Sequence, residues 1–390
     1  MAENMKALQQ ERIKLFRDAA AFKETSRTPH LACAVTWKIF DAGYELKDAL
    51  TDFTVMEKCV RHFLDTYKVD ALIDIGIRNQ FNVTEAFDEK SYYYYNDESV
   101  GIHDHAHCTV DTLDEYIADP EKYIWTRILP EKYGEAWGQK TKEVWKKTFK
   151  EYMNYTKFVI HMGSVTSKEY GLASMAPNNP MKGAIQFGIE ELLANLLGIR
   201  QLSLALRRNA DDLDRFIKVW DEQHIDPIIE KIRKGKGPED SKYCFDASIM
   251  MLAQNFINPK QFERFYWPSL KRLLDAYAEK NMSVRIFTEG TILPYADYFK
   301  DYPKGLLTFH IEKDDPFGFR EKLPNVAIMG GMTTEMLSSA TPEECVEHTK
   351  KLVNELGGGF IFSENKMLSY RNDCRKENML AICEYLNSGR

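Results

Sequence analysis

Short apolar runs separated by amphipathic stretches make up most of this chain. Eight runs have the length and boundaries of buried strands, and they lie near residues 31, 69, 157, 243, 284, 306, 326 and 359. Between many of them, apolar residues recur at helical spacing, as Leu270, Leu273, Leu274 and Tyr277 do within 259–279. Alternating strands and helices predict a parallel sheet, and eight such units predict a (β/α)₈ TIM barrel.

Two further helices are predicted, one at the N-terminus and one that begins near residue 341. Residues Met1 to Lys23 place Met5, Leu8, Leu15 and Phe16 on one face, which predicts an N-terminal amphipathic helix packed on the outside of the barrel. Near the other end of the chain, Thr341-Pro342-Glu343-Glu344 has the sequence of a capping box, with threonine at the N-cap and glutamate three residues later.

The alternation breaks down after the second predicted strand. From about residue 79 to 140, polar, aromatic and acidic residues dominate, including the run Tyr92 to Tyr95. We predict an insertion here, with a hairpin between Tyr92 and Cys108 and a helix that begins near Asp111. The chain as a whole, residues 1–390, is predicted to be one barrel domain that carries this insertion.

Polar side chains stand where two neighbouring strands are predicted to end. Glu289 stands just beyond the apolar run Val284 to Phe287, where that strand is predicted to end, and His310 ends the next apolar run. Twenty residues separate them, which is the length of one strand–helix unit. Since the carboxyl ends of barrel strands form the active face of TIM-barrel enzymes, this edge is the predicted site.

Composition limits the kind of partner. A net charge of −7 argues against nucleic acid, because phosphate binding needs a basic face. We find no apolar run near 18 residues and no signal peptide, so no membrane contact is expected. The seven cysteines are scattered, with no CxxC pair, which is typical of reduced thiols in a cytoplasmic protein.

Several short motifs together resemble the uroporphyrinogen decarboxylase superfamily, which also contains corrinoid-dependent methyltransferases. The resemblance covers nearly the whole chain. Its motifs are Arg27-Thr-Pro, Phe40-Asp-Ala-Gly-Tyr, Tyr67-Lys-Val-Asp70-Ala, Ile257-Asn-Pro-Lys-Gln-Phe262, Thr288-Glu289-Gly290, Gly330-Gly331 and Thr341-Pro-Glu-Glu.

The resemblance also separates the branches of the superfamily. The decarboxylases hold substrate carboxylates with paired arginines in an N-terminal loop, and the matching stretch here, Trp37 to Gly43, has none. The methylthiol branch carries His-x-Cys-Gly on one strand and a later cysteine, where this chain has Phe287-Thr-Glu289-Gly290 and Ser363-Glu364-Asn365-Lys366. The chain therefore resembles the methyltransferase component of anaerobic O-demethylases.

That resemblance implies a zinc-dependent methyltransferase that cleaves a methyl ether, such as a methoxylated aromatic. The methyl group would pass to the cob(I)alamin of a separate corrinoid protein, because this chain lacks the corrinoid motif Asp-x-His-x-x-Gly. Glu289 and His310 are the expected zinc ligands, with Asp246 or Glu364 as the third. A Lewis acid would stabilise the charge that develops on the leaving oxygen.

Other residues are candidates for contact with the substrate. Lys366 would either steady a leaving phenolate, as a third catalytic group beside Glu289 and His310, or form an ion pair only. The expected substrate contacts are Trp37, Tyr93, His161 and Met329. His161 ends the predicted strand Lys157–Gly163, and Met329 is equally typical of a core position.

Four alternatives remain open from the sequence. His103, His105 and His107 alternate within the insertion, so they compete with the strand ends for the metal. The enzyme would otherwise be a metal-free decarboxylase or lyase on the same scaffold. The chain could instead be a non-catalytic module that binds a corrinoid protein or acts as its chaperone. A corrinoid methyltransferase that uses methylamine, methanol or a methylthiol is also compatible with the sequence, which names neither the donor nor the oligomeric state.

Overall fold

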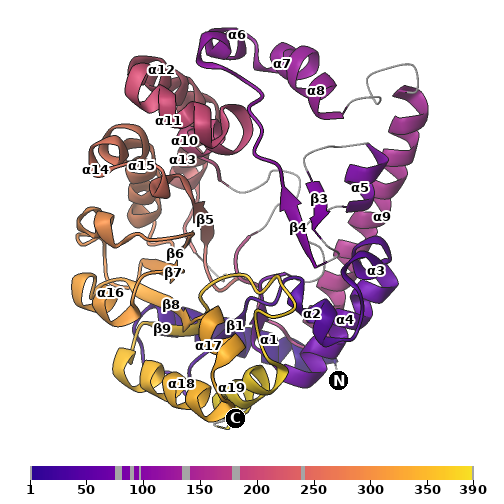
Figure 1. Ribbon diagram of the computed structural model, residues 1–390. Helices are drawn as coiled ribbons and strands as arrows, with labels where there is room; N and C mark the ends of the chain where they lie inside the picture. Colours follow the sequence, from indigo (N-terminus) through magenta and orange to yellow (C-terminus); the bar gives the residue numbers. More distant parts are fainter. Residues whose placement is uncertain are drawn as a thin grey trace.

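A parallel sheet curls through the centre of the molecule. The computed structural model describes residues 2–74, 81–87, 92–95, 98–133, 141–177, 185–238 and 242–388. Within them, seven parallel strands lie in the order β2-β1-β9-β8-β7-β6-β5. Their bounds are β1 His30–Ala32, β2 Ala71–Leu72, β5 Ala247–Met251, β6 Val284–Thr288, β7 Leu307–Ile311, β8 Ala327–Met332 and β9 Phe360–Glu364. Figure 1 shows these strands around the centre, with helices outside them. The predicted α/β barrel is confirmed.

A short extended segment links the two edges of the sheet. The amide of Ala173 donates to the Asp70 carbonyl beside β2, and the amides of Cys244 and Phe245 donate to the carbonyls of Ser174 and Met175. A parallel bridge then joins Ile185 to Ile249 of β5. The segment around Ala173 therefore occupies the place of the remaining barrel strand.

Helices cover the outside of the sheet and form most of the region after β2. The helices of the first half are α1 Ala2–Ala20, α2 Trp37–Asp41, α3 Leu46–Thr51, α4 Phe53–Tyr67, α5 Phe81–Ala86, α6 Leu113–Ala118, α7 Pro120–Tyr123, α8 Leu129–Tyr133 and α9 Thr141–Lys168. Those of the second half are α10 Gly188–Glu191, α11 Gly198–Arg208, α12 Ala210–Trp220, α13 Asp226–Lys234, α14 Pro259–Gln261, α15 Trp267–Glu279, α16 Pro316–Lys322, α17 Thr334–Ser339, α18 Pro342–Leu356 and α19 Lys376–Asn387.

Strand side chains alternate between two buried layers. Ile286, Phe309 and Phe362 belong to a large cluster shared with the helices, whereas Leu31, Met329 and Ile361 belong to a smaller cluster on the opposite face. The smaller cluster also contains Phe16 of α1 and neighbouring α1 residues. Helix α1 therefore covers the N-terminal end of the barrel, and its predicted position on the outside was wrong.

The predicted strand Lys157–Gly163 was also wrong, because these residues lie within α9. Phe158, Met162 and Val165 are buried on one face of that helix, while Ile160 is 69% exposed. This spacing of four and three residues has the helical period. The segment that fills the barrel position lies further along, at Ala173 to Met175.

The region after β2 contains the expected hairpin and helix. Strands β3 (Tyr92–Tyr95) and β4 (Ser99–Ile102) pair in antiparallel fashion, and helical residues start at Val110 and continue as α6. Between α12 and α13, a π-helical turn covers Asp221–Ile225. It lies directly before Pro227, which has no backbone N–H to continue the helical ladder. The helix continues without a gap from α12 through this turn into α13.

The capping box at the start of α18 is confirmed and offers a stability test. The Thr341 hydroxyl accepts from the Glu344 amide at 3.3 Å, and the Glu344 carboxylate accepts from the Thr341 amide at 2.9 Å. Thr341→Ala is expected to lower the free energy of unfolding by about 1 kcal/mol, measured by urea denaturation. Thr341→Ser keeps the acceptor and should lose much less. Equal losses in the two variants would argue against the cap.

The helices of the described residues were also compared with the dimensions of a lipid bilayer. None of them is both long enough and apolar enough to cross it.

Candidate functional site

Polar groups tie together the carboxyl ends of β6 to β9. The Gly290 amide donates to the Glu312 carboxylate at 2.5 Å, and the Asn365 side-chain amide donates to the Glu312 carbonyl at 2.9 Å. The oxygen of the Asn365 side chain accepts from the Gly331 amide at 2.5 Å. Each contact joins the end of one strand to the end of another. These hydrogen bonds therefore hold the backbone in place at the strand ends where the active site is predicted.

Gly290 is required for the turn that follows Glu289. Its φ is +75°, and a Cβ atom there would lie 2.1 Å from the side-chain oxygen of Asn255. The Glu289 carbonyl accepts from Gln254 Nε2 and Asn255 Nδ2, each at 2.6 Å. The backbone around Glu289 is therefore fixed at the end of β6, as the sequence predicted, with the residue itself half-buried.

A cavity of about 560 Å³ opens at the ends of β7, β8 and β9. Lys366 and Asn365 line it after β9, Glu312 after β7, and Glu335 and His348 from the helices beyond β8. Hydrogen bonds from its own backbone amide and from Thr333, together with the charge of Lys366, lower the pKa of Glu335. Lys366 thus brings a positive charge into this cavity on the predicted active face.

Arg285 lies deeper, on the inner face of β6. It is only 6% exposed, and its guanidinium donates to Ser248 Oγ at 3.2 Å and contacts His310 Nδ1 at 2.7 Å. Its Nε has no hydrogen-bond partner, and no carboxylate of the described residues lies within ion-pair distance of it. Burial lowers the pKa of Arg285 to about 10, so the group stays charged at neutral pH. A buried cation without an anion is costly.

Solvent reaches the same inner face beside Arg285. Ser248, which accepts from Arg285, is half-buried. Met250 is the next residue on that face of β5, and it is 42% exposed even though it lies in a barrel strand. The inner face between β5 and β6 is therefore open at this level, and a small ligand approaching from the strand ends would meet Arg285.

His310 lies inside the barrel and is fully buried. Its Nε2 contacts the Glu364 carbonyl at 2.8 Å, while Nδ1 faces Arg285. Burial, and then the charge of Arg285, lower the pKa of His310 to about 3, so the ring is neutral. Both ring nitrogens are engaged in this arrangement. A metal could bind His310 only after one of these contacts opened.

The Glu364 carboxylate is likewise committed to neighbouring groups. One oxygen accepts from the Cys33 amide at 2.6 Å, and the other lies 3.3 Å from His30 Nε2. Glu364 shares its face of β9 with Phe362, which belongs to the helix-side cluster. The carboxylate therefore holds β1 against β9 on the side away from the barrel interior.

Asp246 does not lie at a strand end. Strand β5 begins at Ala247, so the carboxylate precedes the strand and stands at the opposite end of the barrel from Glu289. There it pairs with Arg17 of α1 at 3.2 Å and accepts from the Ser283 amide at 2.7 Å. The predicted strand over Tyr243 to Asp246 was placed too early, and this carboxylate cannot share a metal with Glu289.

The predicted substrate contacts are dispersed. His161 lies on α9, is about half exposed, and contacts the Glu57 carboxylate at 2.9 Å, so its predicted strand-end position was wrong. Trp37 is 2% exposed and donates to the Cys374 carbonyl, and Met329 is fully buried in the smaller cluster. Tyr93 belongs to β3, and its side chain lies outside the described part of the structure.

The four predicted zinc ligands do not come together. Within the described residues, Glu289, His310, Asp246 and Glu364 contribute to no group in which three ligand atoms lie within 4.8 Å of one another. Asp246 is at the wrong end of the barrel, and His310 and Glu364 are used internally. These four residues therefore do not fit a zinc ion in this arrangement.

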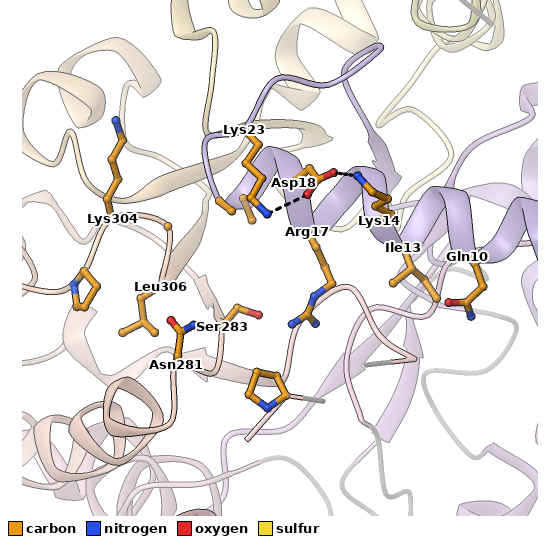
Figure 2. Close-up of a pocket in the computed structure, with 15 residues that line it drawn as sticks. Gln10, Ile13, Lys14, Arg17, Asp18, Lys23, Asn281, Ser283, Lys304 and Leu306 are labelled. Carbon is orange, nitrogen blue, oxygen red and sulfur yellow. Dashed lines mark hydrogen bonds and ion pairs between the residues drawn. The ribbon is translucent and has the colours of Figure 1, made fainter. Parts of the chain in front are cut away.

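Another cavity, of about 450 Å³, lies at the N-terminal end of the barrel. Figure 2 shows it between α1 and the segments around Asn281 and Leu306, with Asp18 between Lys14 and Lys23. These segments precede β6 and β7, so the cavity faces away from Glu289. This end of a TIM barrel serves stability and not catalysis.

Arg285 is the residue that the sequence analysis missed. The pattern of Val284-Arg285-Ile286-Phe287 predicts a buried strand and assigns no role to its one charged residue. A charged residue inside an otherwise buried strand is rare unless it is paired or functional. The charged residue within this apolar run was therefore the sequence signal that could have identified Arg285.

Comparisons with known proteins agree with this architecture. The sequence model of the family described as Uroporphyrinogen decarboxylase (URO-D) matches residues 241–369. The chain has no significant match among curated proteins. Among solved structures, a methyltransferase from Methanosarcina mazei is similar to it over 98% of each chain, with a TM-score of 0.57 and 12% sequence identity. The family match confirms the predicted resemblance to the uroporphyrinogen decarboxylase superfamily over residues 241–369, and the similarity to the solved structure confirms the barrel fold.

Proposed function

We propose that this protein is a methyltransferase. It would take a methyl group from a small methylated acid, such as a methoxylated aromatic carboxylate, and pass it to the cob(I)alamin of a separate corrinoid protein. The likeness to the Methanosarcina methyltransferase, which extends over nearly the full length of both chains, supports methyl transfer on this barrel. The resemblance of the Thr288-Glu289-Gly290 region to O-demethylase components supports an ether as the donor.

The observation that carries the substrate class is the buried Arg285. Its charge lies inside the barrel without a carboxylate partner among the described residues, next to the exposed Met250. An acid group on the substrate would supply the missing anion, and a guanidinium binds a carboxylate in a bidentate manner. Binding by this contact would fix the depth and orientation of the substrate, which leaves its methyl group toward the strand ends.

In the reaction, the carbon–oxygen bond of the ether breaks and a carbon–cobalt bond forms. The corrinoid supplies a strong nucleophile whose electron pair makes the new bond, and the ether oxygen keeps the electron pair of the old one. The leaving oxygen therefore becomes negative. Lys366, in the cavity at the ends of β7 to β9, is the group that we assign to stabilising this charge.

The proposal is tested by mixing the protein with cob(I)alamin under reducing conditions and following methylcobalamin by its absorbance. Methoxybenzoates should be demethylated faster than neutral methoxybenzene, because only the acids can pair with Arg285. Methanol, methylamines and methylthiols complete the panel. Methyl transfer from none of these donors, with a correctly folded protein and with a corrinoid protein added, would rule the function out.

Lys366→Met is expected to lower the rate of methyl transfer about 10²-fold, the typical loss when one group that stabilises a developing oxyanion is removed. Lys313→Met is the matched control, since Lys313 lines the same cavity from the end of β7. Rates are compared at saturating donor. A loss of the same size in both variants would mean that the cavity acts only through its general positive charge.

A decarboxylase is the second candidate, and Arg285 favours it as well, because it too requires an acid substrate. The two reactions have different products. Release of carbon dioxide from a carboxyl-labelled methoxybenzoate, without methylcobalamin, would select the decarboxylase. Formation of methylcobalamin with the carboxylate retained would select the methyltransferase.

A further inference from the structure

Two histidines and a glutamate converge in the region between β4 and α9. His105 Nε2 lies 3.0 Å from Glu131 Oε1, and His107 Nδ1 lies 3.4 Å from Glu131 Oε2. The two imidazole rings are 4.9 Å apart between centroids. One ligand atom from each of the three residues falls within 4.8 Å of the other two, and no other such group of metal-binding side chains occurs in the described residues.

The backbone on both sides of this group is held in place. The Cys108 amide donates to the Leu196 carbonyl at 2.8 Å, and Asp104 accepts from the Ile199 amide at 3.4 Å, so the histidine segment is attached at both ends to the start of α11. The Tyr123 hydroxyl donates to the His107 carbonyl at 3.4 Å. Glu131 comes from α8. Three ligands from two segments of the chain already lie close enough together to contact one metal ion.

We propose that His105, His107 and Glu131 form a binding site for Zn²⁺. Two imidazole nitrogens and one carboxylate oxygen are a ligand set that zinc uses, with a fourth position left for water or for a ligand. This donor set suits Zn²⁺ and not Mg²⁺ or Ca²⁺, which take oxygen ligands. The site is distinct from the strand ends, and its existence does not depend on the proposed methyl transfer.

The exposure of the three side chains agrees with metal binding. His107 is only 9% exposed, so it forms the inner side of the site. His105 and Glu131 are about half exposed, so an ion can enter from solvent. The metal would link the histidine segment to α8. The chain between residues 107 and 131 would then be a loop whose two ends are held by the ion.

The test is a zinc titration of the full-length protein, first freed of metal, in competition with a chromophoric chelator. The wild type should bind about one Zn²⁺ per chain at this site. His105→Ala, His107→Ala and Glu131→Gln should each weaken binding at least 100-fold, since even partners outside the ligand shell cost about 10- to 100-fold. His103→Ala is the matched control, because His103 lies on the same segment and outside the group, and it should bind as the wild type does.

Two further measurements keep the result decisive. Co²⁺ in place of Zn²⁺ should give a visible absorption band of a four-coordinate ion in the wild type and in His103→Ala, but not in His107→Ala. Zinc should also protect the chain between residues 107 and 131 from limited proteolysis. Unchanged zinc affinity in all three ligand variants, no binding by the wild type, or loss of zinc in His310→Ala but not in His107→Ala would overturn the site.

Discussion

Replacing Asp70 with asparagine is expected to lower the free energy of unfolding by about 3–5 kcal/mol, the usual cost of leaving a buried charge without its partner. Asp70 is fully buried and accepts two hydrogen bonds from Arg27, each at 2.6 Å, while Arg12 Nε lies 3.2 Å away. Asparagine keeps the shape of the side chain but removes the negative charge. Two largely buried guanidinium groups would then share a neutral partner.

The measurement is urea denaturation of the wild type and the variant. Glu279→Gln is the matched control, because Glu279 forms an ion pair with Arg233 at 2.8 Å in which both side chains are about half exposed. Surface pairs of this kind contribute about 0–1 kcal/mol, so the control should change little. A similar small change for Asp70→Asn would mean that solvent reaches the Asp70 cluster.

The contact between Arg27 and Asp70 shows why part of the fold could be predicted from the sequence. Arg27 and Asp70 belong to two of the short motifs on which the resemblance rested, and the structure brings them into contact beside β1 and β2. The strands from β6 to β9 were also predicted, because each is a short apolar run with clear breaks around it. Local pattern is sufficient where a strand is buried on both faces.

The barrel position that Lys157–Gly163 was predicted to fill shows where prediction from local sequence pattern fails. Residues 157–163 are rich in apolar side chains, but their period is helical over the longer window of α9. The segment that replaces the strand, Ala173 to Met175, is held by backbone hydrogen bonds to Asp70, Cys244 and Phe245. Such pairing depends on residues distant in sequence, so no short window could have identified it.

Some features of the candidate site could likewise be predicted from the sequence, and others could not. Glu289 and His310 were correctly placed near strand ends, because position along a barrel strand follows from the pattern. The sequence pattern did not predict which groups each side chain contacts. Glu364 differs from Ser363 by one residue and so faces the helices, and Asp246 precedes its strand by one residue. A shift of one position in a strand moves a side chain to the opposite face.

Arg285→Met is expected to remove activity on acid donors while leaving the fold intact. The rate constant kcat/KM for a methoxybenzoate should fall about 10²- to 10³-fold, equivalent to roughly 3–4 kcal/mol, because one partner of a buried charge pair is lost. For neutral methoxybenzene the same variant should differ little from the wild type. Stability should be unchanged or higher, since methionine of similar length replaces a buried cation that has no carboxylate partner among the described residues.

These two readouts together separate recognition from structure. A residue with a purely structural role would lower the rates for both donors in parallel and would lower the melting temperature as well. Arg285→Lys provides a finer test, because lysine keeps the charge but loses the planar, two-donor geometry, and it should recover only part of the rate on the acid. Full activity of Arg285→Met on the acid would refute the pairing, and with it the assignment of an acid substrate to this barrel.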